Sequence, residues 1–141
     1  MRRWLLVGSI VLIAIGFIAA GINHFRAPDI YLGVIPPWLP WPKVLNLISG
    51  AAEIAGGIGV LLPATRRAAG WGLIALLVAV FPANIQMVVN GFPGTDLPVW
   101  VLWARLPFQP LLIAWVWWAC VRHIGPRSRD HGSAEVARGA P

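Results

Sequence analysis

The sequence is short of charged residues and has a single cysteine. Only 11% of its 141 residues are charged, whereas 58% are hydrophobic; a soluble domain carries about 25% charged residues. This composition excludes an ordinary soluble domain and predicts an integral membrane protein. The lone Cys120 excludes an internal disulfide and a CxxC redox pair. We interpret it as a small apolar residue near a helix end.

Several common binding and catalytic motifs are also missing. The histidines His24, His123 and His131 have no metal-ligand spacing, so no metal site is expected. There is no glycine-rich phosphate loop and no set of residues spaced as a nucleophile triad. The net charge of +6 would suit nucleic acid, but the basic residues are placed as membrane topology requires, so no nucleic-acid partner is expected.

Four apolar stretches are long enough to cross a bilayer, which takes about 20 helical residues. They are residues 4–23, 44–62, 68–90 and 99–121. The first is longer than a signal-peptide core, so we expect an uncleaved helix rather than a signal peptide. We therefore predict one all-α domain over residues 1–123, an integral membrane four-helix bundle. The polar residues 124–141 are predicted to form a disordered, basic cytoplasmic tail.

The basic residues predict the orientation of this bundle. Cytoplasmic loops of membrane proteins carry an excess of Lys and Arg. One predicted side has only Arg26 and Lys43, whereas the other has Arg2, Arg3, Arg66, Arg67, Arg122, Arg127, Arg129 and Arg138. We expect both termini in the cytoplasm and a multi-pass protein in the cell inner membrane, with the lipid bilayer as its first partner.

The first outer loop, "HFRAPDIYLGVIPPWLPWP" (residues 24–42), is rich in tryptophan and proline. Its prolines forbid a helix across "IPPWLPWP". An apolar, irregular segment belongs at the membrane interface, folded over the outer end of the bundle. It is an interfacial anchor or a lid over a cavity, and the two roles are compatible.

Polar residues inside the predicted spans gather in the outer half of the bundle. At 1.5 Å per residue, Glu53 and Gln109 lie at similar depth near the midplane, and Arg105 lies one turn above Gln109. Asn84 lies in the outer half of the third span, and His24 ends the first. The commoner role for such a histidine is to cap its helix at the interface; the alternative is a proton relay or a substrate contact.

Glu53 needs a polar partner, because a lone charge near the bilayer centre is costly. Arg105 is the basic residue well inside a span, so we predict a Glu53–Arg105 contact, either direct or through Gln109 or water. The contact would be either a purely structural salt bridge or part of a functional polar cavity.

Prolines and glycines predict the shape of the bundle around these residues. Pro82, Pro107 and Pro110 each remove a helical hydrogen bond, which predicts kinks and a widened outer half. Asn46 and Glu53 share one helical face, on which Gly50 adds no bulk. We interpret the glycines of residues 44–62 as packing glycines.

Four segments together resemble the DoxX family of small four-helix membrane proteins, over about residues 8–120. They are "GINHF", "IPPWLP", "SGAAEIAGGIGVLLPATRRAAGWGLIALLVAVFPANIQM" and "RLPFQPLLIAWVW". The resemblance implies a bacterial inner-membrane bundle. Some DoxX relatives are subunits of thiosulfate:quinone oxidoreductase, and others act in oxidative-stress defence with soluble enzymes. The residues that match recurrent positions of the family are His24, Glu53, Asn84, Arg105 and Gln109.

Two functional hypotheses follow. In the first, the chain is a membrane subunit of a redox system, with a soluble or membrane redox partner, no covalent cofactor and a quinone in its outer-half cavity. Glu53 would exchange a proton, Arg105 would hold an anionic oxygen, and Asn84 and Gln109 would donate to carbonyls. In the second, the chain is a non-enzymatic anchor or scaffold for a partner protein. A small-solute transporter is a weaker third hypothesis, because the inner half is apolar.

Overall fold

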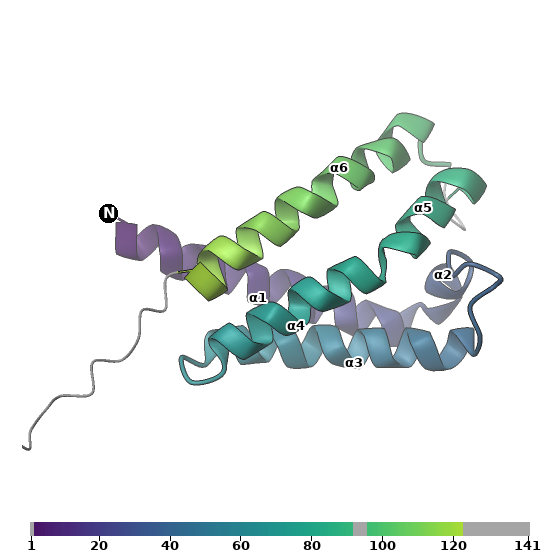
Figure 1. Ribbon diagram of the computed structural model, residues 1–141. Helices are drawn as coiled ribbons and strands as arrows, with labels where there is room; N and C mark the ends of the chain where they lie inside the picture. Colours follow the sequence, from purple (N-terminus) through teal and green to yellow (C-terminus); the bar gives the residue numbers. More distant parts are fainter. Residues whose placement is uncertain (1, 92–95, 123–141) are drawn as a thin grey trace, which may run out of the picture.

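The computed structural model describes residues 2–91 and 96–122, and its regular structure is helical throughout (Figure 1). The elements are α1 (Arg2–Arg26), α2 (Pro28–Leu32), α3 (Pro42–Leu61), α4 (Arg66–Ala79), α5 (Phe81–Asn90), α6 (Val99–Val116) and the π-helix η1 (Trp117–Arg122). The predicted all-α fold is confirmed. The predicted tail, residues 124–141, lies outside the described residues.

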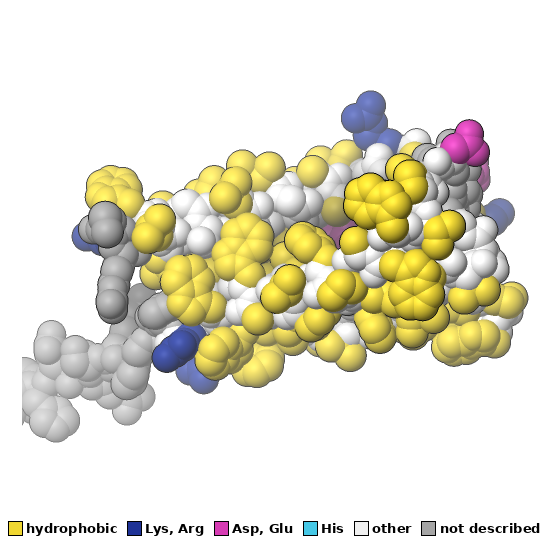
Figure 2. Space-filling model, turned by 90° about the horizontal axis from the view of Figure 1, so that it is seen from above, with side chains coloured by type: hydrophobic (Ala, Val, Ile, Leu, Met, Phe, Trp, Pro, Cys, Tyr) yellow, Lys and Arg dark blue, Asp and Glu magenta, His cyan; other side chains and the backbone are white. Residues whose placement is uncertain are grey.

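Four stretches of these helices are long and apolar enough to cross a membrane. They are Arg3–Arg26, Pro42–Leu61, Arg66–Asn90 and Val99–Arg122, and they match the four predicted spans to within a few residues. Hydrophobic side chains cover most of the face seen in Figure 2, and basic side chains lie toward its two ends. Such an apolar surface suits a lipid bilayer, because its side chains then remain out of water.

The helices form two pairs, which are joined by the packing of α4 on α3 and separate toward one end. α1 packs along α3, while α6 packs on α4 and α5. The start of α1, the α3–α4 connection and η1 lie at one end (Figure 1). Toward the other end, α5 and α6 rise away from α1 and α3, and α2 lies near this wider end. We call it the α2 end.

The third span is broken at Val80, as the proline prediction requires. α4 ends at Ala79 and α5 begins at Phe81, with Pro82 in the first turn of α5. Proline is tolerated there, because first-turn N–H groups have no intrahelical acceptor. Pro107 and Pro110 lie inside α6 without ending it. Of the two spans with predicted proline kinks, only the one that contains Pro82 is interrupted, between α4 and α5.

Glycine allows α1 and α3 to approach closely. A Cβ atom built on Gly21 would lie 2.6 Å from the carbonyl oxygen of Gly50, and one built on Gly50 would lie 2.7 Å from Cβ of His24. Neither position has room for a side chain. The prediction that the glycines of the second span serve packing is confirmed at Gly50, and the same contact brings His24 over α3.

Two apolar clusters hold the bundle. The larger lies toward the η1 end and includes Ile13, Leu73, Val60 and Val116. Cys120 is fully buried in it, which confirms its prediction as a small apolar residue. A smaller cluster of Val34, Met87 and Leu102 lies toward the α2 end. Residues of both clusters line the space described below.

The loop of residues 24–42, which contains α2, folds over the wider end of the bundle (Figure 1). Val34 and Pro36 are buried, and both line the same space together with Tyr31. Trp38 and Trp41 are exposed. One segment therefore presents apolar residues inward and tryptophans outward, an arrangement compatible with both the anchor and the lid.

Candidate functional site

A cavity of about 830 Å³ lies between the two helix pairs. Its lining is predominantly apolar and comes from α1, α3, α4, α5, α6 and the outer loop. The polar residues in the lining are His24, Tyr31, Asn46, Ser49, Glu53, Asn84, Arg105 and Gln109. All five residues that the sequence singled out therefore face one cavity, although they do not form one cluster.

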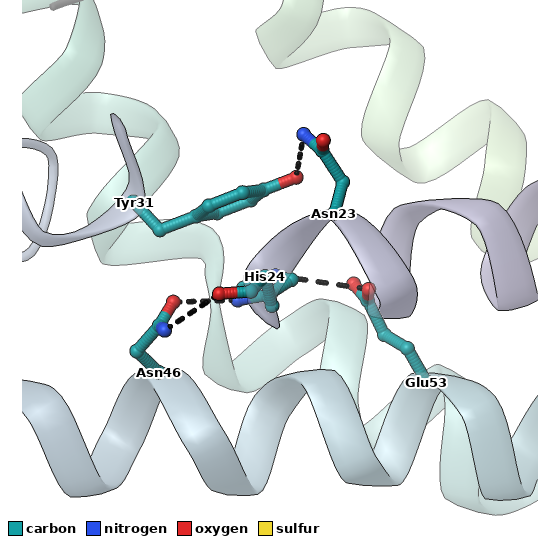
Figure 3. A network of polar contacts seen from close by, with 5 residues as sticks. All are labelled: Asn23, His24, Tyr31, Asn46 and Glu53. Carbon is teal, nitrogen blue, oxygen red and sulfur yellow. Dashed lines mark hydrogen bonds and ion pairs between the residues drawn. The ribbon is translucent and has the colours of Figure 1, made fainter. Parts of the chain in front are cut away.

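His24 is bonded to α3 and does not cap α1 at the surface. It is buried, with 8% of its surface exposed. Its Nδ1 lies 2.7 Å from Oδ1 of Asn46, and Nδ2 of Asn46 donates to the His24 carbonyl at 3.1 Å (Figure 3). That carbonyl would normally accept from the residue four positions later, but Pro28 has no N–H. Asn46 supplies the missing donor.

This double contact also determines which ring nitrogen carries the proton. Because the Asn46 amide N–H faces the His24 carbonyl, the amide oxygen must face Nδ1. An amide oxygen only accepts, so Nδ1 is the donor. In the neutral ring, Nε2 is then an acceptor.

Glu53 faces the other side of the His24 ring. Its Oε2 lies 3.7 Å from Nε2, with the two side chains 14% and 10% exposed (Figure 3). This separation makes an ion pair when the ring is protonated, but it is too long for a hydrogen bond. Oε2 is buried and has no hydrogen-bond partner among the described residues. Asn46 and Glu53 thus lie on either side of His24.

Tyr31 completes this wall from α2. Its ring stacks on His24 with centroids 3.6 Å apart and an interplanar angle of 25°. Asn23 Nδ2 donates to the Tyr31 hydroxyl oxygen at 3.0 Å (Figure 3). Tyr31 was not predicted from the sequence. Asn46 was predicted to share a helical face with Glu53, but it was not named as a site residue. The available signal for Tyr31 was its position as the only tyrosine in the sequence, seven residues after His24.

The opposite wall carries an amide chain that bridges the α4–α5 break. Asn84 Nδ2 donates to Oε1 of Gln109 at 2.5 Å, and Gln109 Nε2 donates to the carbonyl of Leu77. Gln109 is buried. The sequence predicted a freed carbonyl at Val78, and the structure shows the side-chain donor one residue earlier. The physical reason is the same: a broken helix within an apolar span needs other donors for its carbonyl groups.

The predicted direct contact between Glu53 and Arg105 is wrong, and Gln109 does not bridge them either. The ion-pair partner of Glu53 is His24. Arg105 is an exposed residue of α6 that lines the cavity. α6 packs on α4 and α5, and it diverges from α3 toward the α2 end (Figure 1). A similar predicted depth along the two spans therefore did not bring the two side chains together.

The site contains acceptor and donor groups on different walls. Glu53 is an acceptor without a hydrogen-bond partner, whereas the amide nitrogens of Asn46, Asn84 and Gln109 already donate to protein oxygens. Arg105 adds a guanidinium group. No group of three or more His, Cys, Asp or Glu residues that could hold a metal occurs within residues 2–91 and 96–122.

Asn46→Leu is expected to destabilise the protein, because it leaves the His24 carbonyl and Nδ1 without partners. The expected loss in the free energy of unfolding is about 1–3 kcal/mol, measurable by denaturant titration in detergent micelles. Asn23→Leu is the matched control, since it removes an exposed hydrogen bond. Equal effects of the two substitutions would contradict a structural role for Asn46.

Comparison with known proteins finds a family match but no curated or solved relative. The family described as "Domain of unknown function (DUF8561)" matches residues 13–120, which is most of the chain and includes the whole polar lining of the cavity.

Proposed function

The chain belongs to the DUF8561 family, and from its cavity we propose that it binds a quinone-like lipophilic molecule inside a bilayer. The observation that carries this proposal is the cavity between the helix pairs. Its volume of about 830 Å³ lies within the roughly 300–1,000 Å³ of small-molecule sites. Such sites are mostly apolar, with a few polar groups that orient the ligand.

The placement of those polar groups supports a ring with oxygen atoms on it. Glu53 and Arg105 come from α3 and α6, on different sides of the cavity. The apolar lining between them, which includes Phe17, Leu77 and Met87, suits a ring and an alkyl tail. In this proposal, Arg105 holds a ligand oxygen and Glu53 contacts the other polar end. Asn84 and Gln109 position this wall, because each amide nitrogen donates one hydrogen bond within the protein.

We further propose that both termini lie in the cytoplasm and that the membrane is the cell inner membrane. Arg3, Arg66 and Arg122 belong to the end that contains the start of α1, the α3–α4 connection and η1. Arg26 and Lys43 belong to the α2 end. Over the whole sequence, more basic residues belong to the η1 side than to the α2 side, and this asymmetry supports a cytoplasmic η1 end. The polar wall formed by His24, Tyr31 and Asn46 then lies in the outer half of the bilayer.

The resemblance to the DoxX family supports a redox setting and a redox protein as partner. The chain would act there as the ligand-binding membrane subunit. The alternative is a membrane anchor or scaffold, in which the polar residues only hold the helices together. That role predicts a folded protein with no ligand affinity.

Gly16→Trp tests the proposal without removing a polar group. Gly16 lines the cavity, and a Cβ built on it meets nothing within 4 Å. A tryptophan there should occupy ligand space while the fold persists. We expect at least about a tenfold loss of decyl-para-benzoquinone affinity, measured by native mass spectrometry on protein in lipid nanodiscs.

Gly8→Trp is the matched control on the same helix. Its Cβ also meets nothing within 4 Å, but Gly8 is not part of the cavity lining. Wild-type affinity in this variant, beside reduced affinity in Gly16→Trp, would support the cavity as the binding site. No detectable binding to wild-type protein, or equal binding to both variants, would overturn the proposal and favour the anchor.

A further inference from the structure

We propose that the ligand of the cavity carries a hydroxyl group and donates it to Glu53. Hydroquinone- and phenol-type lipophiles should then bind more tightly than quinones, which carry only carbonyl oxygens. This inference rests on the proposed function, because it specifies the ligand of the same cavity. The supporting observation is that the donors lining the cavity leave Oε2 of Glu53 without a hydrogen bond.

His24 does not satisfy the hydrogen-bonding capacity of Glu53. Asn46 holds the ring so that Nδ1 donates to the amide oxygen, which leaves Nε2 as an acceptor in the neutral ring. Nε2 lies 3.7 Å from Oε2 of Glu53, beyond hydrogen-bond distance. His24 therefore balances the charge of Glu53 when it is protonated, but it does not provide a hydrogen bond at this separation.

The other donors that line the cavity do not reach Glu53 either. The amide groups of Asn46, Asn84 and Gln109 donate to the His24 carbonyl, the Gln109 side chain and the Leu77 carbonyl, respectively. The hydroxyl groups of Tyr31 and Ser49 and the Arg105 guanidinium also line the cavity. Within the described part of the chain, none of these groups donates to Oε2 of Glu53. A largely buried carboxyl group without a hydrogen bond is unfavourable. A ligand that brings a donor relieves this cost at the moment of binding.

Hydroquinones and quinones differ in what they can offer to Glu53. A hydroxyl group donates one hydrogen bond and also accepts, whereas a quinone carbonyl only accepts. The hydroquinone can donate one hydroxyl to Glu53 and accept from Arg105 with the other oxygen. The quinone can accept from Arg105, but it leaves an acceptor of Glu53 unpaired. This difference applies to the ionised carboxylate, which only accepts; a protonated carboxyl group would also donate its O–H to a quinone carbonyl.

The size of the preference follows from the hydrogen bond gained. A hydrogen bond to a charged group contributes about 1.5–3 kcal/mol, and 1.4 kcal/mol is a factor of ten in affinity. We therefore expect wild-type protein to bind the hydroquinone about ten- to a hundredfold more tightly than the quinone.

The test uses three probes that share one decyl tail and ring. They are decyl-para-benzoquinone, its hydroquinone kept reduced under anaerobic conditions, and the bis-O-methyl ether of that hydroquinone. Binding constants are measured on full-length protein in lipid nanodiscs. The hydroquinone should bind most tightly, and the ether, which keeps the ring but has no donor, should lose that advantage.

A variant assigns the preference to the carboxyl group. Glu53→Gln provides both a donor and an acceptor, so the ratio of hydroquinone to quinone affinity should fall to within a few-fold of one. Asp29→Asn is the matched control, because Asp29 is an exposed acid of α2 outside the cavity lining. It should keep the wild-type ratio.

The outcomes separate the two proposals. If the quinone binds wild-type protein as tightly as the hydroquinone, or more tightly, the donor inference is overturned while the ligand-binding function stands. If the ether binds as well as the hydroquinone, the preference does not arise from donation and the inference is likewise wrong. If none of the three probes binds, both the proposed function and the inference fail.

Discussion

Gly50→Leu is expected to disrupt the packing of α1 against α3. A Cβ atom at this position would lie 2.7 Å from Cβ of His24 and 2.9 Å from Cε2 of Phe25. The longer leucine side chain must then push the helices apart, and overpacking of this kind costs about 1–3 kcal/mol or more. We expect a lower unfolding temperature in detergent micelles and a loss of ligand binding, since His24 is displaced with α1.

Gly72→Leu serves as the control for this experiment. Gly72 lies on α4, and a Cβ built on it meets nothing within 4 Å. The substitution adds the same side chain to a helix of the same bundle, and stability should stay close to that of wild type. If Gly50→Leu were no less stable than Gly72→Leu, the close approach of α1 and α3 would not hold.

His24→Leu is expected to be more damaging than removal of the whole His24–Glu53 pair. The single substitution leaves Glu53 largely buried without its partner and also removes the ring that bonds Asn46. Breaking a buried ion pair by removing one member costs about 3–5 kcal/mol, whereas replacing both members by apolar residues is often close to neutral. Because the side chains of His24 and Glu53 remain 10% and 14% exposed, the lower end of that range is expected.

The measurement is a double-substitution cycle on the free energy of unfolding, with His24→Leu, Glu53→Leu and the double variant. We expect the double variant to recover part of the stability lost in His24→Leu. Additive losses would show that the two side chains are not coupled, against the contact in the structure. A stable double variant that no longer binds the hydroquinone would separate ligand binding from folding and argue against a purely structural cluster.

The features that depend on local chemistry could be predicted from the sequence. The four spans follow from apolar length. The break before Pro82 follows from the missing N–H of proline. The buried state of Cys120 follows from its apolar surroundings. Each of these depends on a residue and its neighbours along the chain, so no knowledge of the other helices was needed.

The site was predictable only as a set of residues. Burial of polar groups in an apolar span points to a cavity or to a partner, and the five selected residues do line one cavity. Their pairing differed from the prediction. Depth along a helix axis follows from counting residues, but the tilt of α6 and the separation of the two helix pairs do not. Arg105 therefore remained apart from Glu53.

The position of His24 shows where tertiary packing was decisive. Counting along the chain placed it at the end of the first span but did not give its partners, and contacts with Asn46 and Glu53 bury it. The reason is the close approach at Gly50, which leaves room for His24 between those two residues of α3. Helix type, length and the need for polar partners thus followed from the residues themselves. The identity of each partner depended on how closely and at what angle the helices pack.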